Sequence, residues 1–457
     1  MKALLVCPQN PERFYDFVKL PPLGVAYVAA ALRAAGHQVE ILDTTLVRRP
    51  EAAFAAAVAK FEPAIVGFSA SSSTFKPALA LADHLRRARP NAQTVFGGVL
   101  PTWRPAEVAA EPAVDYVVFG EGEVTAVELF NALEKGQKPA DIKGVAFRND
   151  GIVVVNEPRQ LVENLDSLPF PAYDLLPVTS YSTPQASRLP LMAMITSRGC
   201  PYHCIFCDAH LVFGRKYRFH SPERTFAEML LLKKRFAVRQ IAFKDSEFTL
   251  NLERVERLCD LIISERLDLL WTCNGRVGRL PLPLLQKMRR AGCRMIWYGV
   301  ESGDQSILET LKKQITLDEA RETFRLTRLA KIRTVANFLV GNPGETSVSL
   351  EKTLNLALEL KPDFVNFLRL VPYPGTALLK MAEASGWLKG GPDMARSAPD
   401  RAMNATALTD EQLEQAYRRL YRRFYLRPSY LIRRAFVTTA HGWKTNARGL
   451  LKLLQGG

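Results

Sequence analysis

Short apolar runs alternate with helical patterns along most of this chain, and this alternation is the strongest constraint on its fold. The first five runs are rich in Val, Ile and Phe and cover residues 3–7, 38–42, 64–69, 93–96 and 115–119. Helical patterns lie between them at residues 24–35, 75–88 and 124–135. Strands that alternate with such helices predict an α/β fold with a parallel, doubly wound sheet. Ligands of these sheets bind outside the carboxyl ends of the strands.

A second series of strand and helix patterns begins near residue 191. Its candidate strands are residues 191–196, 240–244, 269–274, 294–299, 334–340 and 363–370. Helical stretches separate them, for example at residues 221–236, 251–265, 283–291 and 317–330. Six strand–helix units predict a partial (β/α)6 barrel with its functional residues at the carboxyl ends of the strands.

These patterns predict four segments. Residues 1–140 form the doubly wound, Rossmann-like domain, and residues 141–190 form a β-hairpin and a proline-rich linker. Residues 191–400 form the barrel, and residues 401–457 form a helical C-terminal segment. No apolar run is long enough to predict a membrane-spanning helix, and the run at residues 3–7 is too short for a signal peptide.

The charge of +15 is concentrated at the C-terminal end of the chain. Residues 416–457 hold eight Arg and two Lys and no Asp or Glu, which accounts for +10 of the total. Tyr417, Leu420, Tyr421 and Phe424 fall at helical spacing, with arginines between them. Such a helix can contact an anionic membrane surface or an anionic substrate, or it can pack its apolar stripe on the barrel. Both alternatives stay open at this point.

Three of the seven cysteines fall within eight residues. Residues 197–207 read SRGCPYHCIFC and place Cys200, Cys204 and Cys207 on the loop after the first barrel strand. Thiolates suit iron–sulfur clusters or zinc, and their clustering indicates metal binding in a reducing cytoplasm. Structural zinc sites need four ligands, usually in two separated pairs, and here His203 or His210 would have to complete the set. Three thiolates on a four-iron cluster leave one iron open to a small chelating molecule.

The Cys-x3-Cys-x2-Cys spacing, with aromatic Phe206 before the third cysteine, resembles the radical S-adenosylmethionine superfamily. The resemblance implies a 4Fe–4S cluster on Cys200, Cys204 and Cys207, which would be both metal ligands and catalytic residues. In that family the open iron binds S-adenosylmethionine, and one electron cleaves it to methionine and a 5′-deoxyadenosyl radical. A reductant such as flavodoxin or ferredoxin would supply the electron.

The resemblance extends to polar residues at the ends of the later barrel strands. It implies contacts of Asp245 or Glu247 with the methionine amine, and the two stay open because Asp-Ser-Glu replaces the usual Gly-Gly-Glu. Arg276 and Glu301 would bind the carboxylate, amine or ribose, although ordinary strand-end salt bridges are the alternative. The candidate S-adenosylmethionine-binding residues are Phe206, Asp245, Glu247, Asn274, Arg276, Glu301 and Gly341. Tyr298, Arg369 and Tyr373 are predicted to face a substrate pocket.

Small residues gather at three strand ends of the first domain, where glycine lets a bulky ligand approach the backbone. Their order resembles the cobalamin-binding domain that precedes the barrel in a large radical subclass. The candidate cobalamin-binding residues are Gly67, Ser69, Ser72, Gly97, Gly98, Gly120 and Glu121. No Asp-x-His-x-x-Gly motif is present, because His37 and His84 lie in other contexts. The resemblance therefore implies cobalamin without a protein histidine on cobalt; the alternative is an empty domain.

In this subclass the commonest reaction is methyl transfer from methylcobalamin to an unactivated carbon, which is the leading hypothesis. Residues 416–428 resemble the group that includes the anaerobic magnesium-protoporphyrin ester cyclase and hopanoid-modifying enzymes. That similarity favours radical cyclisation or rearrangement of an apolar, tetrapyrrole or lipid substrate as the alternative. A non-catalytic cobalamin or redox sensor is a third, which the intact cysteine loop opposes. The expected partner is a small-molecule substrate, and nucleic acid is disfavoured.

Overall fold

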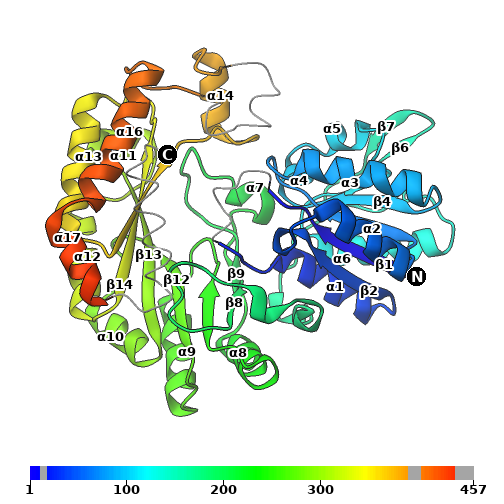
Figure 1. Ribbon diagram of the computed structural model, residues 1–457, viewed down its shortest axis with the longest axis horizontal. Coiled ribbons are helices and arrows are strands. Elements are labelled where there is room, and N and C mark those ends of the chain that lie inside the picture. The colour runs from blue at the N-terminus through cyan, green and yellow to red at the C-terminus, as the bar shows by residue number, and fades with distance from the viewer. Residues whose placement is uncertain (11–17, 390–402, 438–457) are drawn as a thin grey trace. The chain divides into compact units, whose positions relative to one another are not determined.

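The computed structural model describes residues 1–10, 18–389 and 403–437, with side chains up to residue 432 (Figure 1). The N-terminal unit consists of Met1–Ser182, Ser197–Pro201 and Asp208–His220. The barrel unit consists of Thr183–Thr196, Tyr202–Cys207 and the residues from Ser221 onward. Residues 390–400 of the predicted barrel segment and residues 438–457 of the basic segment lie outside the described residues.

The N-terminal unit contains a seven-stranded sheet in the order β2-β1-β3-β4-β5-β6-β7. Its strands are β1 (Lys2–Cys7), β2 (Gln38–Asp43), β3 (Ile65–Ser69), β4 (Gln93–Gly97), β5 (Tyr116–Val118), β6 (Val145–Asn149) and β7 (Ile152–Val155). The first five run parallel, and the predicted hairpin β6–β7 extends the same sheet antiparallel to β5. Because β2 and β3 lie on opposite sides of β1, the strand order reverses there, and such switch points are where these sheets bind ligands.

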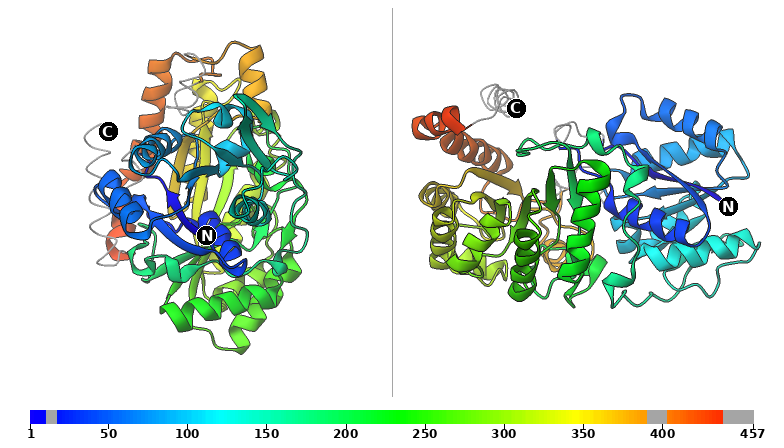
Figure 2. Two further views of the ribbon diagram at one scale, coloured as in Figure 1. Left: turned by 90° about the vertical axis from the view of Figure 1, so that its right-hand side faces the viewer. Right: turned by 90° about the horizontal axis from the view of Figure 1, so that it is seen from below.

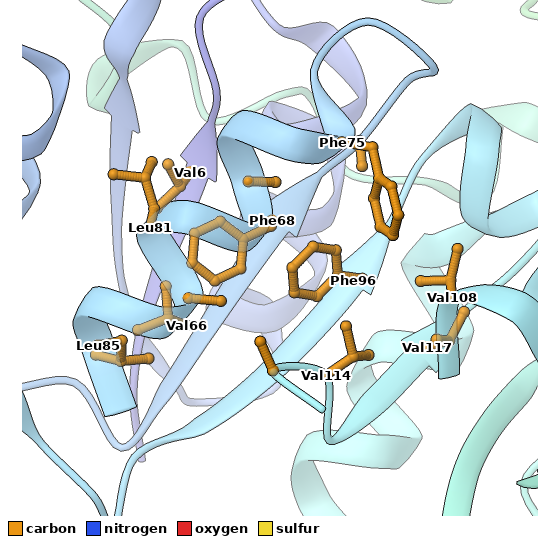
Figure 3. Close-up of a cluster of buried hydrophobic side chains, with 14 of the residues drawn as sticks. Val6, Val66, Phe68, Phe75, Leu81, Leu85, Phe96, Val108, Val114 and Val117 are labelled. Atoms are coloured by element: carbon orange, nitrogen blue, oxygen red, sulfur yellow. The ribbon is translucent and has the colours of Figure 1, made fainter. Parts of the chain in front are cut away.

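Helices cover both faces of this sheet, as a doubly wound fold requires (Figure 2). They are α1 (Leu23–Ala34), α2 (Pro50–Phe61), α3 (Phe75–Ala88), α4 (Val99–Trp103), α5 (Pro105–Ala110) and α6 (Gly122–Glu134). Figure 3 shows the core on one face, where Phe68 and Phe96 of neighbouring strands lie beside Phe75 and Leu81 of α3. The opposite face is covered by α1 and α6. Each buried Phe or Leu contributes roughly 1.5–3 kcal/mol, which makes the sheet a rigid base for its strand-end loops.

The barrel unit contains six parallel strands in the order β15-β14-β13-β12-β11-β8. They are β8 (Leu191–Met194), β11 (Gln240–Phe243), β12 (Leu270–Gly275), β13 (Cys293–Glu301), β14 (Arg333–Val340) and β15 (Phe364–Arg369). Each strand lies beside the next one in the chain, and β8 and β15 form the two ends of the sheet. The predicted partial (β/α)6 barrel is confirmed.

The helices of the barrel unit are α8 (Pro222–Phe236), α9 (Leu252–Ser264), α10 (Leu282–Arg290), α11 (Gln305–Thr310), α12 (Leu317–Leu329), α13 (Ser347–Leu360), α14 (Ala377–Ala384), α16 (Asp410–Tyr425) and α17 (Pro428–Val437). Most of them lie along the outer side of the strands (Figure 1). Helix α14 instead packs against the apolar cluster around Ile205 and Leu311. Within the described residues, no helix combines the length and apolar character needed to cross a membrane.

The aromatic face of α16 packs on the end strand β15. The Tyr421 hydroxyl accepts a hydrogen bond from the backbone N–H of Phe367 at 3.1 Å and donates one to its carbonyl at 2.9 Å. Tyr425 makes the same pair of bonds with Val365, at 3.0 and 2.6 Å. An end strand exposes unpaired backbone groups, and these hydroxyls satisfy them. Of the two alternatives for this amphipathic helix, the structure shows the one in which its apolar side packs on the barrel.

Candidate functional site

The three-cysteine loop begins and ends in the N-terminal unit. The strands β9 (Ser197–Arg198) and β10 (Arg218–Phe219) pair antiparallel, and the residues between them, 199–217, are called the cluster loop below. Gly199 adopts a φ of 84°, and a Cβ there would lie 2.1 Å from the carbonyl oxygen of Lys216. The close approach of the two stems therefore requires glycine next to Cys200. A short helix, α7 (Ala209–Phe213), lies in the second half of the cluster loop.

The middle of the cluster loop, Tyr202–Cys207, belongs to the barrel unit. The N–H of Ile205 donates to the carbonyl of Leu311 at 3.1 Å, and the carbonyl of Ile205 accepts from the N–H of Leu378 at 3.0 Å. Phe206 packs against the apolar cluster formed around Ile205 and Leu311. These contacts fix the segment that carries Cys204 and Cys207, and they give Phe206 a packing role.

The three loop thiols are more accessible than the three cysteines on the strands and helices of the barrel unit. Cys200, Cys204 and Cys207 form no disulfide and are partly exposed, whereas Cys259, Cys273 and Cys293 are buried. Burial raises the pKa of the Cys259 and Cys273 thiols well above the ordinary range, which makes them poor ligands. In the parts of the chain that the structure describes, no three His, Cys, Asp or Glu side chains converge on a point that one metal ion could occupy. A four-iron cluster does not need that convergence because each thiolate binds a different iron, so the donor set fits an iron–sulfur cluster.

A group of buried charges lies at the strand ends of the barrel unit next to Cys204. The Lys313 ammonium donates to Glu301 Oε1 at 2.7 Å, and both side chains are about nine-tenths buried. Burial alone would lower the pKa of Lys313, but the nearby Glu301 carboxylate and Cys204 thiol outweigh it, and the net shift is upward. The Arg276 guanidinium lies 3.4 Å from the ring centre of Tyr202 and bonds to the carbonyl of Lys313.

The backbone at Glu301 is shaped around this pair. Glu301 has a φ of 70°, which is uncommon for a residue other than glycine, and the β13–β14 register shifts between Gly299 and Glu301. A Cβ at Gly299 would lie 2.3 Å from Glu301 Oε1 and 2.8 Å from Lys313 Nζ. Such strain at a strand end is typical of functional sites. Glu301 and Arg276 both contact Lys313, and their contact with S-adenosylmethionine stays a prediction.

The acidic residues after β11 are engaged in two different ways. Asp245 is buried and accepts hydrogen bonds from the N–H and hydroxyl of Thr196, at 2.9 and 2.8 Å. Its carbonyl accepts from the Asn274 side chain at 2.9 Å, so both residues join neighbouring strand ends. Glu247 accepts from the N–H and hydroxyl of Thr249, and burial raises its carboxyl pKa. Asp245 thus supports the end of β8, while the contact with a ligand amine stays a prediction for both acids.

Glu345 organises the loop after β14, where Gly341 lies. Its carboxylate accepts from the N–H groups of Gly341 and Asn342, at 2.7 and 3.2 Å, and from the Asn342 side chain at 2.9 Å. Gly341 has a φ of 96°, so the loop needs glycine there. Burial raises the pKa of Glu345 to about 7, although these hydrogen bonds act in the opposite direction.

Replacing Glu345 by glutamine is expected to remove a pH dependence of stability. Because the folded-state pKa of about 7 exceeds the ordinary value of 4.5, the carboxyl contributes stability that is complete below pH 4.5 and is lost as the pH rises through 7. The difference corresponds to roughly 3 kcal/mol. Urea unfolding of the wild type and Glu345→Gln across this range should show the wild type losing stability relative to the variant as the pH rises. If the two proteins differed in free energy of unfolding by the same amount at every pH, the raised pKa of Glu345 would be contradicted.

Two residues predicted to face a substrate pocket lie elsewhere. Tyr298 is fully buried, and its hydroxyl is 3.0 Å from the hydroxyl of Thr327 on α12, so it faces the helices. Arg369 pairs with Glu414 and lies over the ring of Tyr417, so it anchors α16. The prediction for these two residues is wrong. Strand ends alone did not show which side of the sheet each residue faces.

Glycines at or near the carboxyl edge of the N-terminal sheet are of two kinds. Some are required by close packing, and one has open space beside it. A Cβ at Gly98, where φ is 102°, would lie 2.9 Å from the carbonyl oxygen of Ala70. One at Gly67 would meet the Leu5 side chain at 2.7 Å. Gly120, in contrast, has no atom within 4 Å of such a position. Ser69 pairs with Gly97 across β3 and β4, so these two predicted contact residues share one edge. This glycine-lined edge, at the carboxyl ends of β3, β4 and β5, fits a bulky ligand such as cobalamin.

Two other residues predicted to bind cobalamin, Ser72 and Glu121, lie in segments that are held by contacts within the protein. Ser72 lies in the turn after β3, where hydrogen bonds among Ser71, Ser73 and Thr74 hold the backbone. The Glu121 carboxylate is buried and engaged by arginines of the cluster-loop stems. Their contact with cobalamin stays a prediction.

The histidines named in the sequence analysis lie away from this edge. His37 precedes β2 at the amino end of the sheet and contacts Asn131, and His84 packs on Phe54 from α3. Both positions agree with cobalt without a histidine from either residue.

The structure also adds residues that the sequence patterns missed. Lys313 and Glu345 lie near the barrel strand ends, and Tyr202 lies in the cluster loop over Arg276. Arg198 lies at the cluster-loop stem and pairs with Glu123 of α6. Glu123 lies in the Gly-Glu-Gly-Glu motif, and Glu345 lies in the glycine-rich stretch after β14. Both could therefore have been found from a sequence motif at a strand end. Lys313 has no such motif, because the sequence does not distinguish it from the adjacent Lys312.

Comparison with known proteins agrees with this geometry. Residues 18–130 match the B12 binding domain family, and residues 194–357 match the Radical SAM superfamily. An uncharacterized methyltransferase of Pyrococcus horikoshii is 35% identical over 456 residues, covering 99% of this chain and 98% of that protein. The anaerobic magnesium-protoporphyrin IX monomethyl ester cyclase of Rubrivivax gelatinosus is 29% identical, covering 90% and 75%.

A solved structure has the same fold. The cobalamin-dependent S-adenosylmethionine radical enzyme OxsB, solved with aqua-cobalamin and S-adenosylmethionine, superimposes with a TM-score of 0.77 at 20% identity, over 97% of this chain and 70% of that one. The chain therefore belongs to the cobalamin-dependent radical S-adenosylmethionine methyltransferase family, whose cofactors are a 4Fe–4S cluster, S-adenosylmethionine and cobalamin.

Proposed function

We propose that this enzyme transfers a methyl group to an unactivated carbon of a small-molecule substrate. The main support is that two sites occur in one chain. The first is the three-thiol loop beside the buried charges at the barrel strand ends. The second is the glycine-lined edge of the other sheet, which fits cobalamin. The relative that matches almost the whole chain is named a methyltransferase, which supports the same reaction. When bound, the cluster and S-adenosylmethionine supply a radical, and cobalamin supplies the methyl group.

In this proposal, residues of the cluster loop and of the barrel strand ends bind and orient the cofactors. Cys200, Cys204 and Cys207 hold the cluster, and Arg276 and Glu301 hold the charged groups of S-adenosylmethionine. Lys313 holds the Glu301 carboxylate in place through their ion pair. Glu345 holds the loop at Gly341, whose backbone is the candidate contact for adenine.

Radical cyclisation or rearrangement of an apolar, tetrapyrrole or lipid substrate is the second candidate. It is favoured by the cyclase of Rubrivivax gelatinosus, which matches 90% of this chain. A non-catalytic sensor is disfavoured, because the buried ion pair and the strained Glu301 beside the thiols are features of a reactive site.

Product analysis separates the candidates. The enzyme is reconstituted anaerobically with iron, sulfide and cobalamin, supplied with a reductant, S-adenosylmethionine and extracts of candidate acceptors, and analysed by mass spectrometry. Methyl transfer predicts that 5′-deoxyadenosine and S-adenosylhomocysteine form together. Formation of 5′-deoxyadenosine alone would favour cyclisation, and a bound cluster without either product would favour the sensor.

A flavodoxin or ferredoxin is proposed as the electron donor, because cleavage of S-adenosylmethionine consumes one electron. Peripheral membrane contact through the basic C-terminal segment is weakly supported within the described residues. Arg419 and Arg423 of α16 already pair with Glu351, and Arg418 pairs with Glu414.

Vesicle flotation tests the membrane contact. Because three arginines of α16 have carboxylate partners, replacing Arg418, Arg419, Arg422 and Arg423 by glutamine is expected to leave flotation with anionic vesicles unchanged. Loss of flotation in this variant, with the wild type bound, would assign membrane contact to α16.

A further inference from the structure

Two buried glutamates at the carboxyl edge of the N-terminal sheet contact two buried arginines at the stems of the cluster loop. Glu121 and Glu123 lie where the chain passes from β5 into α6. Arg198 lies two residues before Cys200, and Arg218 pairs with it across β9 and β10. All four side chains are between 2% and 6% exposed.

The four charges form one connected group. Arg198 donates to Glu121 Oε1 at 3.0 Å and to Glu123 Oε1 at 2.5 Å. Arg218 reaches both oxygens of Glu121, at 2.9 and 3.0 Å, and the N–H of Val162 donates to Glu121 Oε2 at 2.7 Å. A buried charge is costly unless it is paired and hydrogen-bonded, and here two positive and two negative charges balance. The group therefore holds one well-defined geometry.

Aromatic rings complete the surroundings of Arg198. Its guanidinium lies 5.3 Å from the ring centre of Tyr27 on α1 and 5.7 Å from that of Phe213 on α7. The Tyr27 hydroxyl lies 3.5 Å from Nε2 of His220, which follows β10. Since Arg198 is bound to helices of the sheet and to the returning stem, the position of Cys200 is set from within the N-terminal unit.

The residue directly before Glu121 links this charged group to the edge assigned to cobalamin. Gly120, directly before Glu121, has a φ of 80° and open space where a Cβ would point. It lies at the edge assigned to cobalamin. Cys204 and Cys207, in contrast, belong to the barrel unit.

We propose that Glu121, Glu123, Arg198 and Arg218 are positioning residues that couple cobalamin binding to the placement of Cys200. The inference rests on the cofactors of the family and not on which substrate is methylated. Cobalamin that orders the Gly120–Glu123 motif favours the cluster-binding position of Cys200. By reciprocity, the cluster then favours cobalamin by the same factor.

Thiol reactivity of the cluster-free full-length chain tests the coupling. The variants are Arg198→Lys, which keeps the charge but cannot bridge both glutamates, and Glu123→Gln, which keeps the shape. The matched control is Glu128→Gln, on the same helix α6, whose partner Arg159 is outside the cluster loop. Alkylation of Cys200, Cys204 and Cys207 is followed separately by peptide mass analysis, with and without hydroxocobalamin.

In the wild type and the control, hydroxocobalamin is expected to slow the alkylation of Cys200. In Arg198→Lys and Glu123→Gln, alkylation of Cys200 should be faster and insensitive to hydroxocobalamin, while Cys204 and Cys207 keep wild-type rates. After reconstitution, both variants should bind normal iron, show an altered electron paramagnetic resonance spectrum with S-adenosylmethionine, and form 5′-deoxyadenosine about 10–100-fold more slowly.

Wild-type Cys200 reactivity and spectra in both variants would overturn the proposal, as would a wild type whose Cys200 does not respond to hydroxocobalamin. If Glu123→Gln fails to fold, Arg198→Lys carries the test because its charge balance is intact. The thiol measurement needs no turnover, so a failure of the methyl-transfer hypothesis would leave its outcome readable.

Discussion

Replacing Cys204 by alanine is expected to reduce 5′-deoxyadenosine formation to background. Cys204 is partly exposed and lies on the segment that Ile205 fixes to the barrel unit through both of its backbone groups. A four-iron cluster held by two thiolates has lost one of its three protein ligands, so the cluster should be lost or should cease to reduce S-adenosylmethionine. Iron content, the visible absorption of the cluster and the product are measured together.

Cys259→Ala is the matched control, since it removes a thiol that is buried on α9. This control should keep its iron and its activity. Activity of Cys204→Ala near the wild-type level would contradict the assignment of the cluster ligands.

Replacing Lys313 by methionine is expected to weaken both stability and S-adenosylmethionine cleavage. The change leaves the Glu301 carboxylate buried without its 2.7 Å partner, and breaking a buried pair typically costs about 3–5 kcal/mol. Because Glu301 and Arg276 are both organised around Lys313, cleavage should fall by about 10–100-fold, as for other residues that orient metal-site ligands. Urea unfolding and 5′-deoxyadenosine formation measure the two effects.

Two further variants separate charge from position. Lys312→Met changes the adjacent lysine, which is exposed, and should resemble the wild type. The double variant Glu301→Gln, Lys313→Met removes the unpaired charge and should regain most of the lost stability without regaining activity. Full activity of the double variant would show that this pair is structural only.

The two sheets could be predicted from the sequence because each rests on a local pattern. Runs such as residues 3–7 and 64–69 are apolar on both faces, as strands covered by helices on both sides must be. The cluster ligands could be predicted because three thiols in one short loop are close in space in any fold. The sheet topology confirms the two sheets, and the family comparison agrees with a cluster of this type. The individual cysteine ligands stay a prediction.

Residues that depend on contacts between distant segments could not be predicted in this way. Lys313 and Lys312 are equivalent in the sequence, and only the fold turns Lys313 toward Glu301. Tyr298 was wrongly assigned to the pocket because strand side chains alternate in direction, and it faces Thr327 on α12. The Glu121–Arg198 contact joins residues 77 positions apart, and neither residue has a local signal for the other.

The most direct test of the central claim is the yield of 5′-deoxyadenosine from the anaerobically reconstituted, reduced enzyme with S-adenosylmethionine. The account predicts that the product forms in proportion to bound cluster in the wild type and is absent when Cys200, Cys204 and Cys207 are all replaced by alanine. A wild type that carries the cluster but forms no 5′-deoxyadenosine, or a triple variant that still forms it, would contradict the account.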